Sequence, residues 1–197
     1  MIRLRPDLAA VAAMVPPGSR VLDIGCGDGA LMTALRDDKG ADARGIELSR
    51  DGVSAAVARG LSVVQGDADT DLGGYPADAF DVAILSQTLQ ATIRPDHVLD
   101  ELLRIGQRAI VSFPNFGHWR VRLALLAGGR MPMTSALPVE WYETMNIHFC
   151  TVDDFRALVA TKGYVVEQEQ FLSRDRPVAG LFANLLAENA IFMLRRG

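Results

Sequence analysis

The stretch Val21–Leu35, VLDIGCGDGALMTAL, constrains the fold most strongly, because it joins a strand-like run to a helical run through three glycines. Gly25, Gly27 and Gly29 permit a tight turn and remove Cβ atoms where a ligand or a crossing helix comes close. In open α/β sheets, ligands bind beyond the carboxyl ends of the strands, and the turn after the first strand lies there. The sequence therefore predicts a ligand lying against bare backbone at this turn.

Strand-like runs alternate with helical patterns along most of the chain. The predicted strands are Arg20–Ile24, Ala43–Glu47, Ser62–Gln65, Phe80–Leu85, Arg108–Phe113, Tyr164–Phe171 and Asn189–Leu194. Strands separated by helices in this way indicate βαβ units and a parallel sheet with helices on both faces. The last two runs are expected to form a hairpin that adds antiparallel strands at one edge. The pattern predicts a doubly wound α/β domain.

The chain has 197 residues, which suits one domain with a substantial core. We expect a single domain over residues 1–197, with an insertion at about 114–150, where the alternation of strands and helices stops. Thr151, at the end of this insertion, is expected to cap the next helix.

Composition excludes several classes of partner. The formal net charge is −4, and Lys and Arg are scattered, so no basic footprint indicates nucleic acid. No apolar run reaches the roughly 18–20 residues that a membrane span needs. Cys26 and Cys150 have no Cys or His neighbours at zinc-like spacing, which indicates neither a disulfide framework nor a metal site. We expect a cytoplasmic protein with reduced thiols.

Three classes of ligand bind glycine-rich turns of this kind. A nucleotide-triphosphate loop needs Gly-Lys-Ser/Thr, which the chain lacks. A dinucleotide fingerprint reads G-x-G-x-x-G, whereas residues 25–29 read G-x-G-x-G, and Asp23 and Asp28 would repel a pyrophosphate. S-Adenosylmethionine has no phosphate and carries a sulfonium and an ammonium, both of which nearby carboxylates stabilise. The acids therefore favour this cofactor.

VLDIGCGDG, followed by Glu47 at the end of the second predicted strand, resembles the class I S-adenosylmethionine-dependent methyltransferases over about residues 20–113. The resemblance implies their Rossmann-like fold, a mostly parallel seven-stranded sheet with an antiparallel last strand and helices on both faces. It also implies that Glu47 accepts hydrogen bonds from the ribose hydroxyls and that Asp67 binds the amino group of adenine. A carboxylate has enough acceptor sites for both hydroxyls.

The cofactor contacts expected for S-adenosylmethionine or S-adenosylhomocysteine are Asp23, Gly25, Cys26, Gly27, Gly29, Glu47, Leu48, Gly66, Asp67, Ala68 and Ser86. Some of these residues have a plainer interpretation. Gly25 and Gly29 could serve turn geometry alone, and Asp67 could be a solvated loop acid or a cap. We interpret Cys26 as a small packing residue rather than a nucleophile, and expect Asp69 to face solvent together with Asp71.

The sequence does not identify a binding site for the methyl acceptor. After the fourth predicted strand the chain reads SQTLQ, without the Asn/Asp-Pro-Pro-aromatic sequence of enzymes that methylate amines of nucleobases. For each histidine, His97, His118 and His148, a structural or surface role is favoured over that of a general base. The polar and aromatic side chains that fit either acceptor binding or partner docking are Asn115, Arg120, Trp119, Trp141 and Tyr142.

The segments FPNFGHWRVRLALLAGGRMP and LPVEWYETMNIHFCTVDDF, together with SQTLQA, resemble the MetW family of methionine biosynthesis proteins over nearly the whole chain. This resemblance implies a methyltransferase-like protein that works with homoserine O-acetyltransferase, or with the corresponding succinyltransferase, and whose own methyl acceptor is undefined. Two functions stay open at this point: a cofactor-binding accessory protein and an active small-molecule methyltransferase. A nicotinamide-dependent redox enzyme is disfavoured by the glycine spacing and the acids.

Overall fold

The computed structural model describes residues 4–131, 133, 140–144 and 148–197. Parts of the expected insertion, at 132, 134–139 and 145–147, lie outside the described residues. In chain order the elements are α1 (Pro6–Met14), β1 (Arg20–Ile24), α2 (Ala30–Lys39), β2 (Asp42–Glu47), α3 (Arg50–Ala58), β3 (Ser62–Gln65), η1 (Leu72–Gly74), β4 (Phe80–Ser86), η2 (Leu89–Ala91), α4 (Pro95–Ile105), β5 (Gly106–Pro114), α5 (Trp119–Gly128), α6 (Val152–Thr161), β6 (Val165–Ser173), β7 (Arg176–Pro177), η3 (Gly180–Phe182), α7 (Ala183–Leu186) and β8 (Asn189–Arg195).

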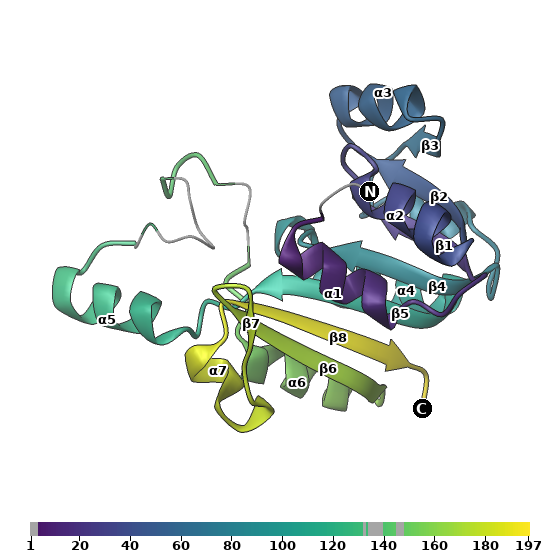
Figure 1. Ribbon diagram of the computed structural model, residues 1–197. Helices are drawn as coiled ribbons and strands as arrows, with labels where there is room; N and C mark the ends of the chain where they lie inside the picture. The colour runs from purple at the N-terminus through teal and green to yellow at the C-terminus, as the bar shows by residue number, and fades with distance from the viewer. Residues whose placement is uncertain (1–3, 132, 134–139, 145–147) are drawn as a thin grey trace.

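The strands form one eight-stranded sheet in the order β3-β2-β1-β4-β5-β8-β6-β7 (Figure 1). Strands β1 to β5 pair in parallel. Strand β8 is antiparallel to both of its neighbours, β5 and β6. The α/β class, the mostly parallel sheet and the antiparallel last strand are thus confirmed. The eighth strand, β7, is a two-residue pairing with the end of β6, too short to give a pattern in the sequence.

The last two predicted strands extend the sheet beyond β5 as expected, with β8 beside β5 and β6 outside it, but only β8 is antiparallel to the first five strands. Five consecutive residues of β8 are buried, as a strand covered on both faces requires. Strand β6 is mostly polar and exposed in its first half, which suits a position near the edge. Since β6 is antiparallel to β8, it runs in the same direction as the first five strands.

Helices cover both faces of the sheet. Helices α1 and α2 pack on one face, where Val11 and Leu35 meet Ile84 of β4. Helices α4 and α6 pack on the other, where Leu102 and Phe155 join the larger core cluster. The start of α6 is fixed by a capping box that joins Thr151 to Asp154, as expected from the sequence.

Helix α5 behaves differently from the other long helices. It follows β5 and extends away from the sheet (Figure 1). Val121 is its one buried residue among the ten. Across the described ranges, no helix combines the length and the apolar character that crossing a membrane requires.

Candidate functional site

The glycine turn after β1 lies where the strand order reverses, between β1 and β4. Gly25, Gly27 and Gly29 all have positive φ angles, of 74°, 56° and 75°. An L-residue is strained in this left-handed region, whereas glycine is not. A Cβ on Gly25 would lie 2.5 Å from Oγ1 of Thr88, but a Cβ on Gly27 would meet nothing within 4 Å. Gly27 therefore leaves open space beside the backbone.

Two hollows adjoin at this turn and share Gly25, Gln87 and Thr88 in their linings. The first has a volume of about 480 Å³ and extends past Asp23 toward the start of α1. The second has a volume of about 290 Å³ and extends past Glu47 at the end of β2. These sizes suit a small elongated molecule bound across both hollows.

Every predicted contact residue except Gly29 lines one of these hollows. The first is lined by Asp23, Gly25, Cys26, Gly27 and Ser86, and the second by Gly25, Glu47, Leu48, Gly66, Asp67 and Ala68. Gly29 is instead the N-cap residue of α2, and a Cβ there would collide with Cδ1 of Leu61 and crowd Ala56. Gly29 therefore serves turn geometry and helix packing, the plainer of its two interpretations.

The carboxylate of Glu47 connects the end of β2 to the glycine turn. Its Oε2 accepts a hydrogen bond from the backbone N–H of Gly27 at 2.8 Å, and its Oε1 accepts one from Ser49 at 2.8 Å. Each carboxylate oxygen can accept a second hydrogen bond, so Glu47 keeps acceptor capacity toward the second hollow. The sequence predicted a ligand contact here but not this structural bond.

Asp23 lies beneath the glycine turn with a side chain that is almost completely buried. Burial, and to a smaller extent the charge of Glu47, raises the pKa of Asp23 from 3.8 to about 7. A cation in the first hollow would favour the ionised carboxylate and would lower this pKa again. Near neutral pH the charge of Asp23 is therefore sensitive to what occupies the hollow.

Cys26 is buried beside the same acids, and its thiol is not activated. Burial, followed by the charges of Asp23 and Glu47, raises the pKa of the Cys26 thiol to about 12. A thiol must ionise to act as a nucleophile. This environment supports the packing role expected for Cys26.

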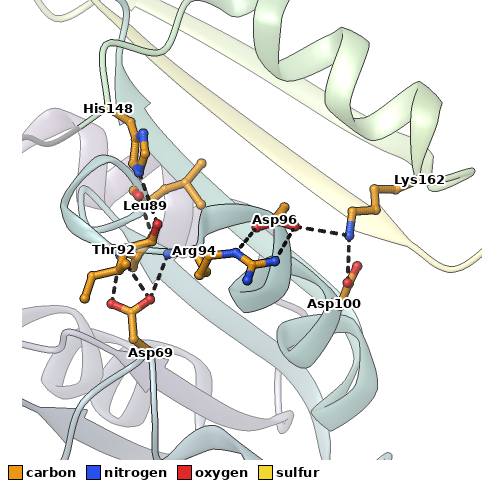
Figure 2. A network of polar contacts seen from close by, with 9 residues as sticks. Asp69, Leu89, Thr92, Arg94, Asp96, Asp100, His148 and Lys162 are labelled. Carbon is orange, nitrogen blue, oxygen red and sulfur yellow. Dashed lines mark hydrogen bonds and ion pairs between the residues drawn. The ribbon is translucent and has the colours of Figure 1, made fainter.

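The loop after β3 is held by its own acids. Oδ1 of Asp67 accepts from the backbone N–H of Asp69 at 2.9 Å, while the Asp67 N–H donates to Oδ2 of Asp71 at 2.8 Å. The carboxylate of Asp69 accepts from the N–H groups of Ile93 and Arg94, with oxygens 2.9–3.0 Å away. Figure 2 shows this carboxylate pointing toward the segment of Thr92 and Arg94. The expectation that Asp69 faces solvent is wrong, because it joins this loop to the segment before α4.

The end of β4 carries a residue that sequence reasoning missed. Gln87 lines both hollows, and its φ of 55° is unusual for a residue other than glycine. Its N–H donates to the carbonyl of Ser112 at 2.9 Å, and its side chain donates to Oδ1 of Asn189 at 3.2 Å. Backbone strain of this kind is concentrated at functional sites, and it leaves no signal in the sequence.

No histidine lines either hollow in the part of the chain that the structure describes. His118 is buried, accepts from the N–H of Arg120 at Nδ1 and so caps α5, and burial lowers its pKa. Nε2 of His148 lies 3.4 Å from the carbonyl oxygen of Ile93, and His97 is exposed on α4. These placements agree with the structural and surface roles favoured for the histidines.

Asn115 also has a structural role rather than a role in acceptor binding. Its Nδ2 donates to carbonyl oxygens of the α7 region, including that of Ala187 at 2.8 Å. Its Oδ1 accepts from the N–H of Gly117 at 2.9 Å. The amide is thus fully engaged in holding the end of β5 against α7, and the idea that it contacts an acceptor is wrong.

Comparison with known proteins agrees with this geometry. The chain has the fold of an S-adenosylmethionine-dependent methyltransferase from Mesorhizobium loti, with a TM-score of 0.73, 19% identity and 98% of each chain covered. It also resembles magnesium protoporphyrin IX methyltransferase of Synechocystis, solved with bound S-adenosylmethionine, with a TM-score of 0.62, 16% identity, and coverage of 96% of this chain and 78% of that one. Likeness at this level of identity shows the fold alone.

The family is shown by sequence. A family model described as methionine biosynthesis protein MetW matches residues 5–194. A bifunctional methionine biosynthesis protein MetXA/MetW from Rhodopirellula baltica is 34% identical in an alignment of 184 residues, which covers 89% of this chain but only 30% of that relative. Since the match spans nearly all of the described fold and both hollows, this chain belongs to the MetW family of methionine biosynthesis proteins.

Proposed function

We propose that this protein binds S-adenosylmethionine or S-adenosylhomocysteine across the two hollows and acts with homoserine O-acetyltransferase in methionine synthesis. The observation that supports cofactor binding is the placement of Asp23 and Glu47 on the two sides of the glycine turn. A ligand with a cationic amino-acid end and an uncharged nucleoside end matches one buried acid and one acid with spare acceptor sites.

The nucleoside end fits the second hollow. Glu47 has acceptor sites left for ribose hydroxyls, and Asp67 has one carboxylate oxygen beyond the one that binds Asp69. Leu48, which is 57% exposed, lies at the same hollow and offers apolar surface to a base. The amino-acid end would then lie in the first hollow, beside Asp23 and the open backbone of Gly27.

We favour an accessory role over an active small-molecule methyltransferase. Transfer to a hydroxyl or an ammonium needs a group that removes a proton. In the described part of the chain, no histidine, lysine or tyrosine lines either hollow, and the Cys26 thiol is held protonated. Among the carboxylates that line the hollows, Asp23, Glu47 and Asp67 are assigned to the cofactor. Asp69 binds the backbone of Ile93 and Arg94, and Asp28 forms an ion pair with Arg59. A fold shared with methyltransferases does not by itself imply methyl transfer.

The partner is suggested by the Rhodopirellula relative, whose name joins MetXA and MetW in one bifunctional chain. Two activities joined covalently in one organism favour association of the corresponding separate chains in another. We therefore expect this protein to bind homoserine O-acetyltransferase and to change its activity.

Two measurements test the proposal. Isothermal titration calorimetry with S-adenosylhomocysteine should show saturable binding to one site, and Glu47→Ala should weaken it. Acetylation of homoserine should be assayed with the acetyltransferase alone, with this protein, and with this protein plus cofactor. No heat at saturating cofactor would overturn the first half, and an acetyltransferase unchanged in every mixture would overturn the second. Turnover of S-adenosylmethionine with a defined acceptor would instead establish the methyltransferase.

A further inference from the structure

Helix α5 exposes apolar side chains that nothing in the described chain covers. Leu123, Leu125 and Leu126 are 54%, 41% and 86% exposed, and Val121 is the helix's one buried residue. The helix extends from the end of β5 away from the sheet (Figure 1). A helix of ten residues has little stability of its own in water, so burial of its apolar side chains by a partner would stabilise it.

A second apolar group lies beside the base of α5, on η3 and α7. Leu181 and Phe182 are 87% and 55% exposed, and the two leucines of α7 are 42% and 39% exposed. The segment that leads into α5 contacts α7, because Asn115 Nδ2 donates to the carbonyl of Asn184 at 3.1 Å and a Cβ on Gly117 would lie 2.6 Å from Asn184 Oδ1. We call this the α5–α7 surface, made of Trp119, Leu123, Leu125, Leu126, Leu181, Phe182, Leu185 and Leu186.

The charge of this region is opposite to that of the whole protein. Residues 114–139, which include α5, contain three arginines and no Asp or Glu, although the net charge of the chain is −4. Arg122 donates to the carbonyl of Gly117, and the guanidinium of Arg120 lies 5.3 Å from the ring centroid of Trp119. An apolar surface bordered by arginines is complementary to an apolar face bordered by carboxylates.

We infer that the α5–α7 surface docks homoserine O-acetyltransferase, through a face of that enzyme that is apolar and bordered by carboxylates. This inference rests on the proposed function, which supplies the partner, and adds the place where the partner binds. A second copy of this chain, docked through the same surface about a two-fold axis, fits less well, because it would bring the arginines of α5 close to one another. Exposed apolar side chains gathered on neighbouring elements mark interaction surfaces more often than ones scattered singly.

The α5–α7 surface is separate from the candidate cofactor site. None of its residues lines either hollow, in the ranges that the structure describes. Substitutions on the surface should therefore leave cofactor binding intact. This separation allows docking and cofactor binding to be tested independently.

The test compares Leu123→Glu combined with Leu126→Glu against Val57→Glu, a control on α3 whose side chain is 52% exposed and lies far from the surface in the fold. Binding of purified homoserine O-acetyltransferase would be measured by biolayer interferometry, and calorimetry with S-adenosylhomocysteine would verify that each variant is folded. We expect the double variant to bind the enzyme at least about tenfold more weakly, and the control to bind normally. Wild-type affinity should fall as salt rises from about 50 to about 500 mM, since arginines border the surface.

Each other outcome overturns a defined part of the argument. If the wild-type protein binds the enzyme and the double variant binds it equally well, the surface is wrong while the proposed function stands. If the wild-type protein does not bind the enzyme, the proposed partner fails together with its docking site. Light scattering that shows a dimer of wild type and a monomer of the double variant would assign the surface to a second copy. Leu126-dependent sedimentation with anionic vesicles would assign it to a membrane.

Discussion

Glu47 at the end of β2 accepts a hydrogen bond from the backbone N–H of Gly27 in the turn after β1, at 2.8 Å. This bond fixes the distance between the two strand ends that border the second hollow. The same carboxylate is the predicted partner of the ribose hydroxyls. One side chain thus positions the turn and is available to a ligand. Its removal should therefore affect both the geometry of the turn and the affinity for the ligand.

Glu47→Ala should weaken binding of S-adenosylhomocysteine by about 1.5–3 kcal/mol, the range for hydrogen bonds to a charged group. The fold should persist, because the residue lies at the end of a strand. Asp42→Ala is the matched control, since Asp42 is an exposed acid at the opposite end of the same strand. Calorimetry on both variants measures the difference. Equal affinities would show that Glu47 does not contact the ligand.

Asp23 should make the unliganded protein less stable as pH rises. Its pKa is raised from 3.8 to about 7 in the folded state, so between these values the folded chain binds more protons than the unfolded chain. The contribution of Asp23 to the free energy of unfolding therefore falls by up to about 1.4 kcal/mol per pH unit over this window. Relative to wild type, Asp23→Asn should become more stable at about pH 8 than at about pH 5. Urea unfolding at both pH values measures this, and a constant difference would contradict the buried, protonated carboxyl.

Gly27→Ala and Gly29→Ala should have opposite consequences, although both glycines have positive φ angles. Alanine at Gly27 meets nothing within 4 Å, so it should cost only the backbone strain of about 1–2 kcal/mol while placing a methyl group in the first hollow. Alanine at Gly29 adds a collision with Leu61, for a total of about 2–4 kcal/mol. We expect the first variant to lose ligand affinity and the second to lose stability. Urea unfolding measures the stability of both variants and calorimetry measures their ligand affinity. A greater loss of stability in Gly27→Ala than in Gly29→Ala would contradict the prediction.

Asp69→Ala should destabilise the segment before α4. It removes the acceptor for the N–H groups of Ile93 and Arg94, and we expect a loss of about 1–3 kcal/mol in the free energy of unfolding. Asp51→Ala, on the exposed first turn of α3, is the control and should change stability by less than about 0.5 kcal/mol. Because Asp69, Ala91 and Thr92 line the second hollow, ligand affinity should fall in the first variant alone. Identical unfolding curves for the two variants would show that Asp69 is dispensable.

The local patterns of the sequence determined the class of fold and most of the candidate site. A strand, three glycines and a helix in succession predicted the turn at Gly25, and the alternation of strands and helices predicted the parallel sheet. Glu47 and Asp67 were assigned to the cofactor through the resemblance to class I methyltransferases, at positions where a predicted strand ends or has just ended. The turn and the parallel sheet need only periodicity and position along the chain, whereas the roles of these two acids depend on the resemblance.

The tertiary structure alone decided what depends on residues that are far apart in the sequence. Gly29 packs against Leu61, Asp69 binds the backbone of Arg94, and β8 enters the sheet between β5 and β6. The pKa of Asp23 depends on burial by elements that the sequence does not place around it. The physical reason is that periodicity and turn chemistry act between near neighbours, whereas burial, long-range hydrogen bonds and charge interactions exist only once the chain has packed.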